Sequence, residues 1–178
     1  YTLRCLKSIV NSINYSKDEL KNIKIKFPII DFKSEKNIID KFNSILQNNF
    51  FSFEIKSLDY DKYSTYISGK NEENKSVTDN QKSNMSNIYQ SLDLSKKCDD
   101  LIYFVEDDYL HTKNSILEMV LAYEKFSSQL NKEIFLCPAD YPYLYRDVEN
   151  TNILIGDKSH WRTINQTLCT FLTSREMI

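Results

Sequence analysis

Glycine is scarce in this chain: its 178 residues include only Gly69 and Gly156. Nucleotide-binding loops of the G-x-G-x-x-G and G-x-x-x-x-G-K-[ST] kinds need several glycines close together, so that backbone amides can approach the phosphates. Neither loop is present. A nucleotide bound by this chain therefore needs another group to hold its phosphates, and a metal ion on carboxylates is the usual substitute.

The chain also lacks an excess of either charge and a long apolar run. Its 23 Lys and Arg against 25 Asp and Glu give a formal net charge of −2, which indicates no general affinity for nucleic acid or an anionic membrane. No apolar stretch approaches the roughly 18 residues of a membrane span. We expect a cytoplasmic protein with no transmembrane segment and no nucleic-acid partner; peripheral association with a membrane stays open.

Cysteine is sparse as well, and no two cysteines form a C-x-x-C pair. Cys5, Cys98, Cys137 and Cys169 are separated by long gaps. Because zinc sites use closely spaced ligand pairs, zinc ligation is not expected. We interpret these residues as reduced, mostly buried thiols.

Helix and strand patterns alternate along the chain. Helical spacing of apolar residues covers 2–13, 38–47, 84–97 and 112–126, and short apolar or β-rich runs cover 23–32, 51–58, 101–105, 133–138 and 152–155. This order predicts an α/β fold with a mainly parallel sheet flanked by helices, in one domain over residues 1–178. The polar stretch 60–82 is predicted to be a long loop.

Three consecutive acids, Glu106, Asp107 and Asp108, follow the apolar run 101–105. In open α/β sheets, ligands bind beyond the carboxyl ends of the strands, which is where these acids stand. Alternate side chains of an extended segment share a face, so Glu106 and Asp108 can point together while Asp107 points away. Carboxylate oxygens suit Mg²⁺ or Mn²⁺, and such an ion can bridge to a diphosphate. The alternative is three solvated acids near a helix N-terminus.

Asp140 is a candidate catalytic residue, because it follows the run 133–138 and can serve as a base toward an acceptor hydroxyl. The alternative is a turn acid beside Pro142. Three tyrosines that follow it, Tyr141, Tyr143 and Tyr145, can stack on a sugar ring, although such residues more often pack in the core or its rim.

The segment 156–162, GDKSHWR, is the densest polar cluster near the C-terminus. Asp157 is a second candidate catalytic acid. His160 is a candidate third metal ligand, and Arg162 is a candidate ligand for the phosphates. A lone histidine is more often structural, so both interpretations of His160 stay open.

Several segments together resemble the family 2 glycosyltransferases of the GT-A fold. LIYFVEDDYL at 101–110 resembles the apolar strand and D-x-D-type signature of that family, and TLRCLKSI at 2–9 resembles its first helix. FPIIDFKSEKN at 27–37 resembles the second strand with its turn, and SNMSNIYQSL at 83–92 the helix before the D-x-D strand. TFLTSREMI at 170–178 is similar to the segment that opens the acceptor region. The resemblance covers most of the chain in order.

The resemblance implies a metal-assisted hexosyltransferase with a GT-A-like fold. It would move a sugar from a nucleotide-diphosphate sugar to a hydroxyl of a glycan, lipid or protein acceptor, with Mn²⁺ or Mg²⁺ as cofactor. By position, Asp31 would contact the base or ribose and Asp108 would be the main metal ligand. Glu106, or the neighbouring Asp107, would assist through the metal, water or the ribose.

The family has a first strand before the matched motifs and an acceptor region with the catalytic base after them. We therefore expect this chain to be a fragment of a longer enzyme. Two other functions stay open: another metal-dependent nucleotide-sugar enzyme, such as a nucleotidyltransferase, and a non-catalytic α/β interaction module.

Overall fold

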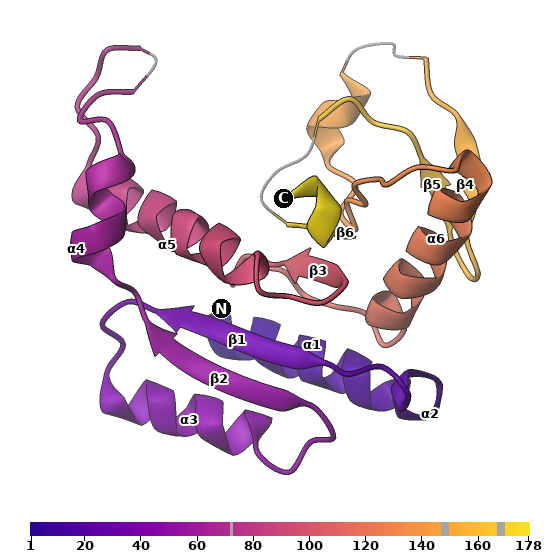
Figure 1. The fold of residues 1–178 in the computed structure, drawn as a ribbon, viewed down its shortest axis with the longest axis horizontal. Helices are drawn as coiled ribbons and strands as arrows, with labels where there is room; N and C mark the ends of the chain where they lie inside the picture. The colour runs from indigo at the N-terminus through magenta and orange to yellow at the C-terminus, as the bar shows by residue number, and fades with distance from the viewer. Residues whose placement is uncertain (72, 147–149, 167–169) are drawn as a thin grey trace. The chain divides into compact units, whose positions relative to one another are not determined.

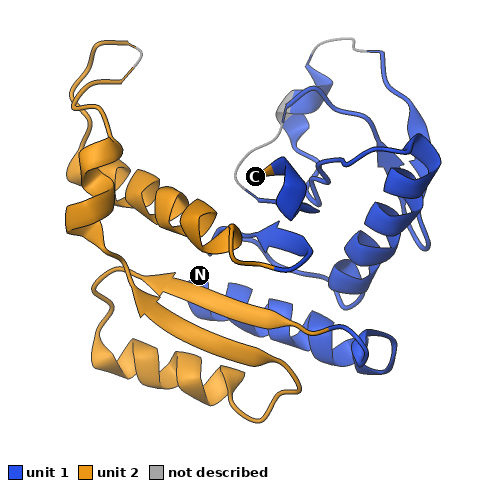
Figure 2. Cartoon of the chain, in the orientation of Figure 1, with its two compact units in different colours: residues 1–23, 99–177 blue, residues 24–98, 178 orange. Residues whose placement is uncertain are grey.

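A computed structural model describes residues 1–71, 73–146, 150–166 and 170–178 of the protein. The chain divides into two compact units (Figure 2). The first unit comprises residues 1–23 and 99–177, and the second comprises residues 24–98 and residue 178. Helices and strands occur in both, which confirms the mixed α/β class.

The second unit is built on a parallel pair of strands (Figure 1). β1 (Lys26–Asp31) pairs with β2 (Ser52–Ser57), and α3 (Lys36–Leu46) connects them. The register places Asp31 opposite Ser57, so both strands end at the same edge. α3 buries Phe42 and Leu46, which lie one turn apart on its inner face.

After β2, the chain of the second unit is largely helical. α4 (Tyr60–Tyr63) is capped by Asp59, whose carboxylate accepts a hydrogen bond from Lys62 N. A 3₁₀ turn, η1 (Ser64–Tyr66), follows, and α5 (Asp79–Ser95) begins at a capping box formed by Thr78 and Gln81. The predicted loop over 60–82 is thus helical at both ends, because two side-chain caps start helices within a polar sequence.

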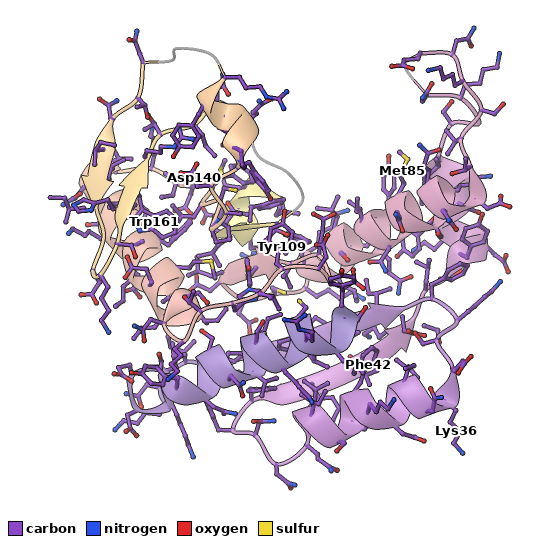
Figure 3. The ribbon with its side chains drawn as sticks, turned by 180° about the vertical axis from the view of Figure 1, so that it is seen from behind. Lys36, Phe42, Met85, Tyr109, Asp140 and Trp161 are labelled. Atoms are coloured by element: carbon purple, nitrogen blue, oxygen red, sulfur yellow. The ribbon has the colours of Figure 1, made fainter. Side chains whose placement is uncertain are left out.

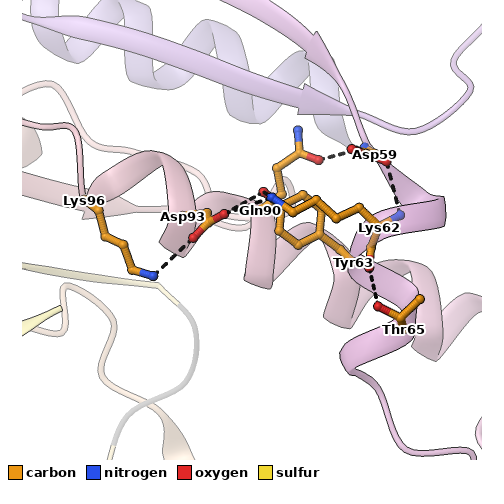
Figure 4. A network of polar contacts seen from close by, with 7 residues as sticks. All are labelled: Asp59, Lys62, Tyr63, Thr65, Gln90, Asp93 and Lys96. Atoms are coloured by element: carbon orange, nitrogen blue, oxygen red, sulfur yellow. Dashed lines mark hydrogen bonds and ion pairs between the residues drawn. The ribbon is translucent and has the colours of Figure 1, made fainter.

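A buried amide joins α5 to the carboxyl end of β2. Gln90 Oε1 accepts a hydrogen bond from Asp59 N at 2.7 Å, and Gln90 Nε2 donates to Ser57 O at 3.1 Å. The Gln90 contact with Asp59 is drawn in Figure 4. Because both polar atoms of this buried side chain are satisfied, it links the helix and the strand end at no desolvation penalty.

Among the described residues, the first unit contains three α-helices and two antiparallel strand pairs. The helices are α1 (Thr2–Tyr15), α2 (Lys17–Leu20) and α6 (Ser115–Leu130). The strands are β3 (Leu101–Phe104), β4 (Ile153–Ile155), β5 (His160–Arg162) and β6 (Phe171–Ser174), and short 3₁₀ turns lie at Pro142–Tyr145 (η2) and Arg175–Met177 (η3). β3 pairs with β6, and β4 pairs with β5, both antiparallel.

The core of the first unit centres on α6. Its inner face contributes Met119, Ala122, Tyr123 and Phe126, and these pack against Leu136 and Leu172. α1 is fastened to the start of α6 through Ser12, a fully buried side chain. Its hydroxyl donates to Lys113 O and accepts from Ile116 N, both at 3.1 Å.

The predicted, mainly parallel sheet is found only in part. Among the described residues, the parallel pair β1–β2 is a separate sheet from the two antiparallel pairs. The predicted strand 133–138 forms only an isolated bridge between Leu136 and Leu172. A short apolar run is equally compatible with parallel and antiparallel pairing, so the sequence could not decide the direction of β3.

Cys5 is buried, and Cys98 and Cys137 are half-buried; all three are free thiols. Cys169 lies outside the described residues. Within the described part of the chain, no helix has the length and apolar character that crossing a membrane requires.

The capping box of α5 leads to a stability prediction. Replacing Thr78 by Ala removes the side-chain acceptor for Gln81 N and should lower the free energy of unfolding by about 1 kcal/mol. Thr112→Ala is the matched control, because α6 has its N-cap at Asn114. We expect the control to stay within about 0.5 kcal/mol of the parent in urea denaturation. Equal losses in both variants would contradict the role of the cap.

Candidate functional site

The three acids lie directly beyond the carboxyl end of β3, in the first unit. Glu106, Asp107 and Asp108 are all exposed. Glu106 N donates a hydrogen bond at 3.1 Å to the hydroxyl of Thr170, which is fully buried just before β6. Because β3 and β6 pair side by side, this bond holds the start of the acidic segment against the neighbouring strand.

The first turn of α1 holds the same segment from a second direction. Cys5 Sγ contacts Glu106 O at 3.5 Å, and the hydroxyl of Thr2 donates to the Asp107 carboxylate. Among the described residues, neither the Glu106 nor the Asp108 carboxylate makes a side-chain hydrogen bond. The contacts therefore engage Asp107 and leave the carboxylates of Glu106 and Asp108 without a side-chain partner among the described residues. Asp107 and Asp108 lie in a turn and not in the extended segment on which the predicted alternation rests.

The acids create a strongly negative environment. Partial burial, and then the charges of Asp108 and Asp107, raise the pKa of Glu106. Burial, with a further contribution from Asp107 and Asp108, raises the pKa of the Cys5 thiol to about 11. Cys5 is thus a neutral thiol near pH 7 and a poor nucleophile or metal ligand.

Glu106 and Asp108 fit one kind of divalent-cation site. Within the described residues, no three His, Cys, Asp or Glu side chains gather closely enough to hold a metal ion by themselves. His160 is accordingly not brought to the two acids; it is exposed in β5, opposite Ile155. Mg²⁺ commonly uses only one or two carboxylates and takes its remaining ligands from phosphate and water. The pair matches that donor set without His160.

Two tyrosines border the acids. The hydroxyls of Tyr109 and Tyr141 are in direct contact, and their rings meet edge to face with centroids 6.4 Å apart. Desolvation, the contact with Tyr109 and the charge of Glu106 all raise the pKa of Tyr141. The Tyr141 hydroxyl therefore stays protonated at neutral pH. The sequence pointed to Tyr141 only as a stacking residue, and it offered no signal for the pairing.

His111 anchors the segment that follows the acids. Its backbone N donates to Ser8 Oγ at 2.9 Å, and its ring Nε2 lies 2.8 Å from the hydroxyl of Tyr103. Burial lowers the pKa of His111, so the ring is neutral at pH 7. These contacts connect the acidic segment to α1 and β3.

Asp140, which is labelled in Figure 3, and Arg162 are brought together, although the sequence pattern pointed to separate roles for them. Arg162 donates from Nε and Nη2 to Asp140 Oδ1, at 3.3 and 2.8 Å, and the hydroxyl of Tyr145 donates to Oδ2. The guanidinium also lies over the Tyr145 ring. Arg162 and then Tyr145 lower the pKa of Asp140, which makes this carboxylate a weak base. The arrangement favours a structural pair over a catalytic base and a free phosphate ligand.

A buried carboxylate that sequence reasoning missed holds the β4–β5 hairpin. Glu118 of α6 is 7% exposed, and it accepts hydrogen bonds from Asp157 N, Lys158 N and Trp161 Nε1 at 3.2, 2.8 and 3.1 Å. A Cβ on Gly156 would lie 2.3 Å from Glu118 Oε1, so only glycine fits there. Asp157 thus sits on a fastened turn with an exposed side chain. The sequence did contain a signal for this buried role, because Glu118 stands among the apolar residues of the segment 116–123.

The remaining predicted residue, Asp31, lies in the second unit beside an open hollow of about 940 Å³. Asp31 ends β1, and its carboxylate accepts a hydrogen bond from Ser34 N across a turn in which Lys33 is left-handed, with φ of 62°. Phe32 stacks on Tyr60 at the rim, with centroids 5.3 Å apart. The hollow opens at the carboxyl ends of two parallel strands, where α/β folds bind ligands.

The two glycines provide a test of the hairpin anchor. Gly156→Ala should force the turn away from Glu118 and shift the fluorescence of Trp161, the only tryptophan. Glu118→Gln should give a similar shift and lower the free energy of unfolding by about 1–3 kcal/mol, because an amide cannot accept from all three donors at its two ends.

Gly69→Ala is the matched control, since a Cβ there meets nothing within 4 Å. It should leave the emission unchanged. A parental spectrum for Gly156→Ala and Glu118→Gln would rule out the anchoring role.

Comparison with protein-family models, with curated proteins and with solved structures yields no match for this chain.

Proposed function

We propose that this chain transfers a sugar from a nucleotide-diphosphate sugar to an acceptor hydroxyl, assisted by Mg²⁺ or Mn²⁺ bound at Glu106 and Asp108. The observation that carries the proposal is the pair of exposed carboxylates beyond the carboxyl end of β3. Their backbone is held by Thr170 and α1, so the position is defined before any ligand arrives.

In this reaction the protein would mainly position the substrates and stabilise the negative charge of the leaving group. A bound divalent cation would neutralise the negative charge that develops on the leaving nucleoside diphosphate. Glu106 and Asp108 would hold the cation, while Thr2 engages the Asp107 carboxylate. Phenolic hydroxyls such as those of Tyr109 and Tyr141 are suitable donors toward oxygen atoms of the donor substrate.

Asp31 and the hollow within the second unit would, by themselves, suit a nucleoside. The carboxylate can accept hydrogen bonds from ribose hydroxyls, and the Phe32–Tyr60 stack offers an apolar aromatic rim for a base. The absence of a glycine loop agrees with phosphates held through a metal ion.

The contacts of Asp140 and Asp157 distinguish the two candidate catalytic bases. Asp140 keeps Arg162 in place and is held ionised by it, so it is not the base of this proposal. Asp157 has an exposed side chain on the β4–β5 turn and remains the candidate base within the described residues.

Thermal unfolding with ligands tests the proposal. Mn²⁺ together with UDP or GDP should raise the melting temperature of the parent, by an amount corresponding to about 2.7 kcal/mol at a ligand concentration one hundred times the Kd. Asp108→Asn should abolish the metal-dependent part of this shift, because it removes a charged ligand while keeping the side-chain shape.

Asp100→Asn is the matched control, since Asp100 precedes β3 at the opposite end of the strand. It should retain the full shift. The proposal fails if the parent responds to neither nucleotide with metal, or if Asp108→Asn responds as strongly as Asp100→Asn.

A further inference from the structure

Three tyrosines of the second unit form an aromatic cluster in which Tyr63 is buried and the other two are exposed. Tyr63 of α4, Tyr66 of η1 and Tyr89 of α5 are in consecutive ring contact, with centroids 6.2 Å apart for the first pair and 5.8 Å for the second. Tyr66 is 57% exposed and Tyr89 is 42% exposed. Large exposed aromatic groups that touch one another are unusual on a surface unless they bind something.

The cluster borders a second hollow of about 390 Å³, which is also lined by Leu92, Asp93 and Lys96 of α5 and by Ile178. This volume is at the lower end of the range for small-molecule sites, about 300–1,000 Å³. The rings are inclined to one another by 62° and 43°. They therefore form a cup and not the parallel-walled slot that would enclose a flat nucleobase.

One side of this hollow is polar and already ordered (Figure 4). Asp93 Oδ2 accepts from the Tyr63 hydroxyl at 2.9 Å and from Lys62 Nζ at 3.3 Å, while Oδ1 accepts from Lys96 Nζ at 3.1 Å. The Tyr63 hydrogen bond, followed by those of the two lysines, lowers the pKa of Asp93 to about 2. An ionised acceptor and an ammonium donor thus stand beside the aromatic faces.

We propose that this tyrosine cup, formed by Tyr63, Tyr66, Tyr89, Asp93 and Lys96, binds a neutral pyranose ring. The faces of Tyr66 and Tyr89 carry negative π density, which attracts the polarised C–H groups of a sugar face. The ammonium of Lys96 has further protons to donate to ring hydroxyls, and the Asp93 oxygens have lone pairs left to accept from them.

A sugar suits this combination better than an apolar protein segment. An apolar partner would desolvate the ion pair of Asp93 and Lys96 without replacing its contacts with water, which is unfavourable. Sugar hydroxyls can replace those contacts while the ring covers the tyrosines. The site belongs to the second unit and needs no metal, so it is independent of the function proposed for the acids of the first unit.

Saturation-transfer NMR in EDTA tests the inference on the full chain. The probes are the methyl pyranosides of glucose, galactose, mannose and N-acetylglucosamine, with uridine as a flat competitor. At least one glycoside should receive saturation from the tyrosine ring protons. Tyr66→Ala and Tyr89→Ala should each weaken that binding about tenfold or more, whereas Tyr66→Phe should stay within about threefold of the parent.

Tyr15→Ala is the matched control, because Tyr15 is a tyrosine of α1, 61% exposed, outside the cup. It should bind as the parent does, and circular dichroism should show each variant folded. The inference is overturned if none of the four glycosides binds, if Tyr66→Ala binds as tightly as Tyr15→Ala, or if uridine alone receives saturation. These outcomes do not depend on how Asp108→Asn responds to metal and nucleotide.

Discussion

The hydrogen bond from Glu106 N to the buried hydroxyl of Thr170 is the constraint on which the acidic site depends. It connects the residue that begins the acidic segment to the residue that precedes β6, and the β3–β6 pairing brings the two segments together. Three adjacent carboxylates repel one another, and this repulsion does not favour any single conformation of the loop. Fixing its backbone to a buried partner places the carboxylates without using their oxygen atoms.

The same solution recurs elsewhere in the chain, where one buried polar side chain joins two elements. Ser12 fastens α1 to α6, Gln90 joins α5 to the end of β2, and Glu118 holds the β4–β5 turn. Each side chain is buried, and each has its polar atoms paired with backbone groups. Such contacts define a single arrangement because an unpaired donor or acceptor inside the protein would cost about 1–3 kcal/mol.

Contacts also separate the acids that are available for chemistry from those that are already engaged. Asp140 shares its two oxygens between Arg162 and Tyr145, and Glu118 is used entirely by the hairpin. Glu106 is different, because its pKa is raised by burial and by neighbouring carboxylates. A cation would relieve that repulsion, whereas Asp140 already has Arg162 as a positively charged partner.

The sequence by itself determined most element types, the mixed α/β class and the position of the acids at a strand end, because hydrophobic period and strand polarity are local properties. It missed the helices at both ends of 60–82 and the bridge in place of a strand at 133–138. The predicted strands 23–32 and 51–58 contain the observed β1 and β2, and the parallel pairing of these two agrees with the helix between them. Tertiary structure alone decided that β3 runs antiparallel to β6, that Arg162 meets Asp140, and that Glu118 needs glycine at 156. Each of these depends on contacts between residues far apart in the chain, and neither charge nor periodicity at one position encodes its distant partner.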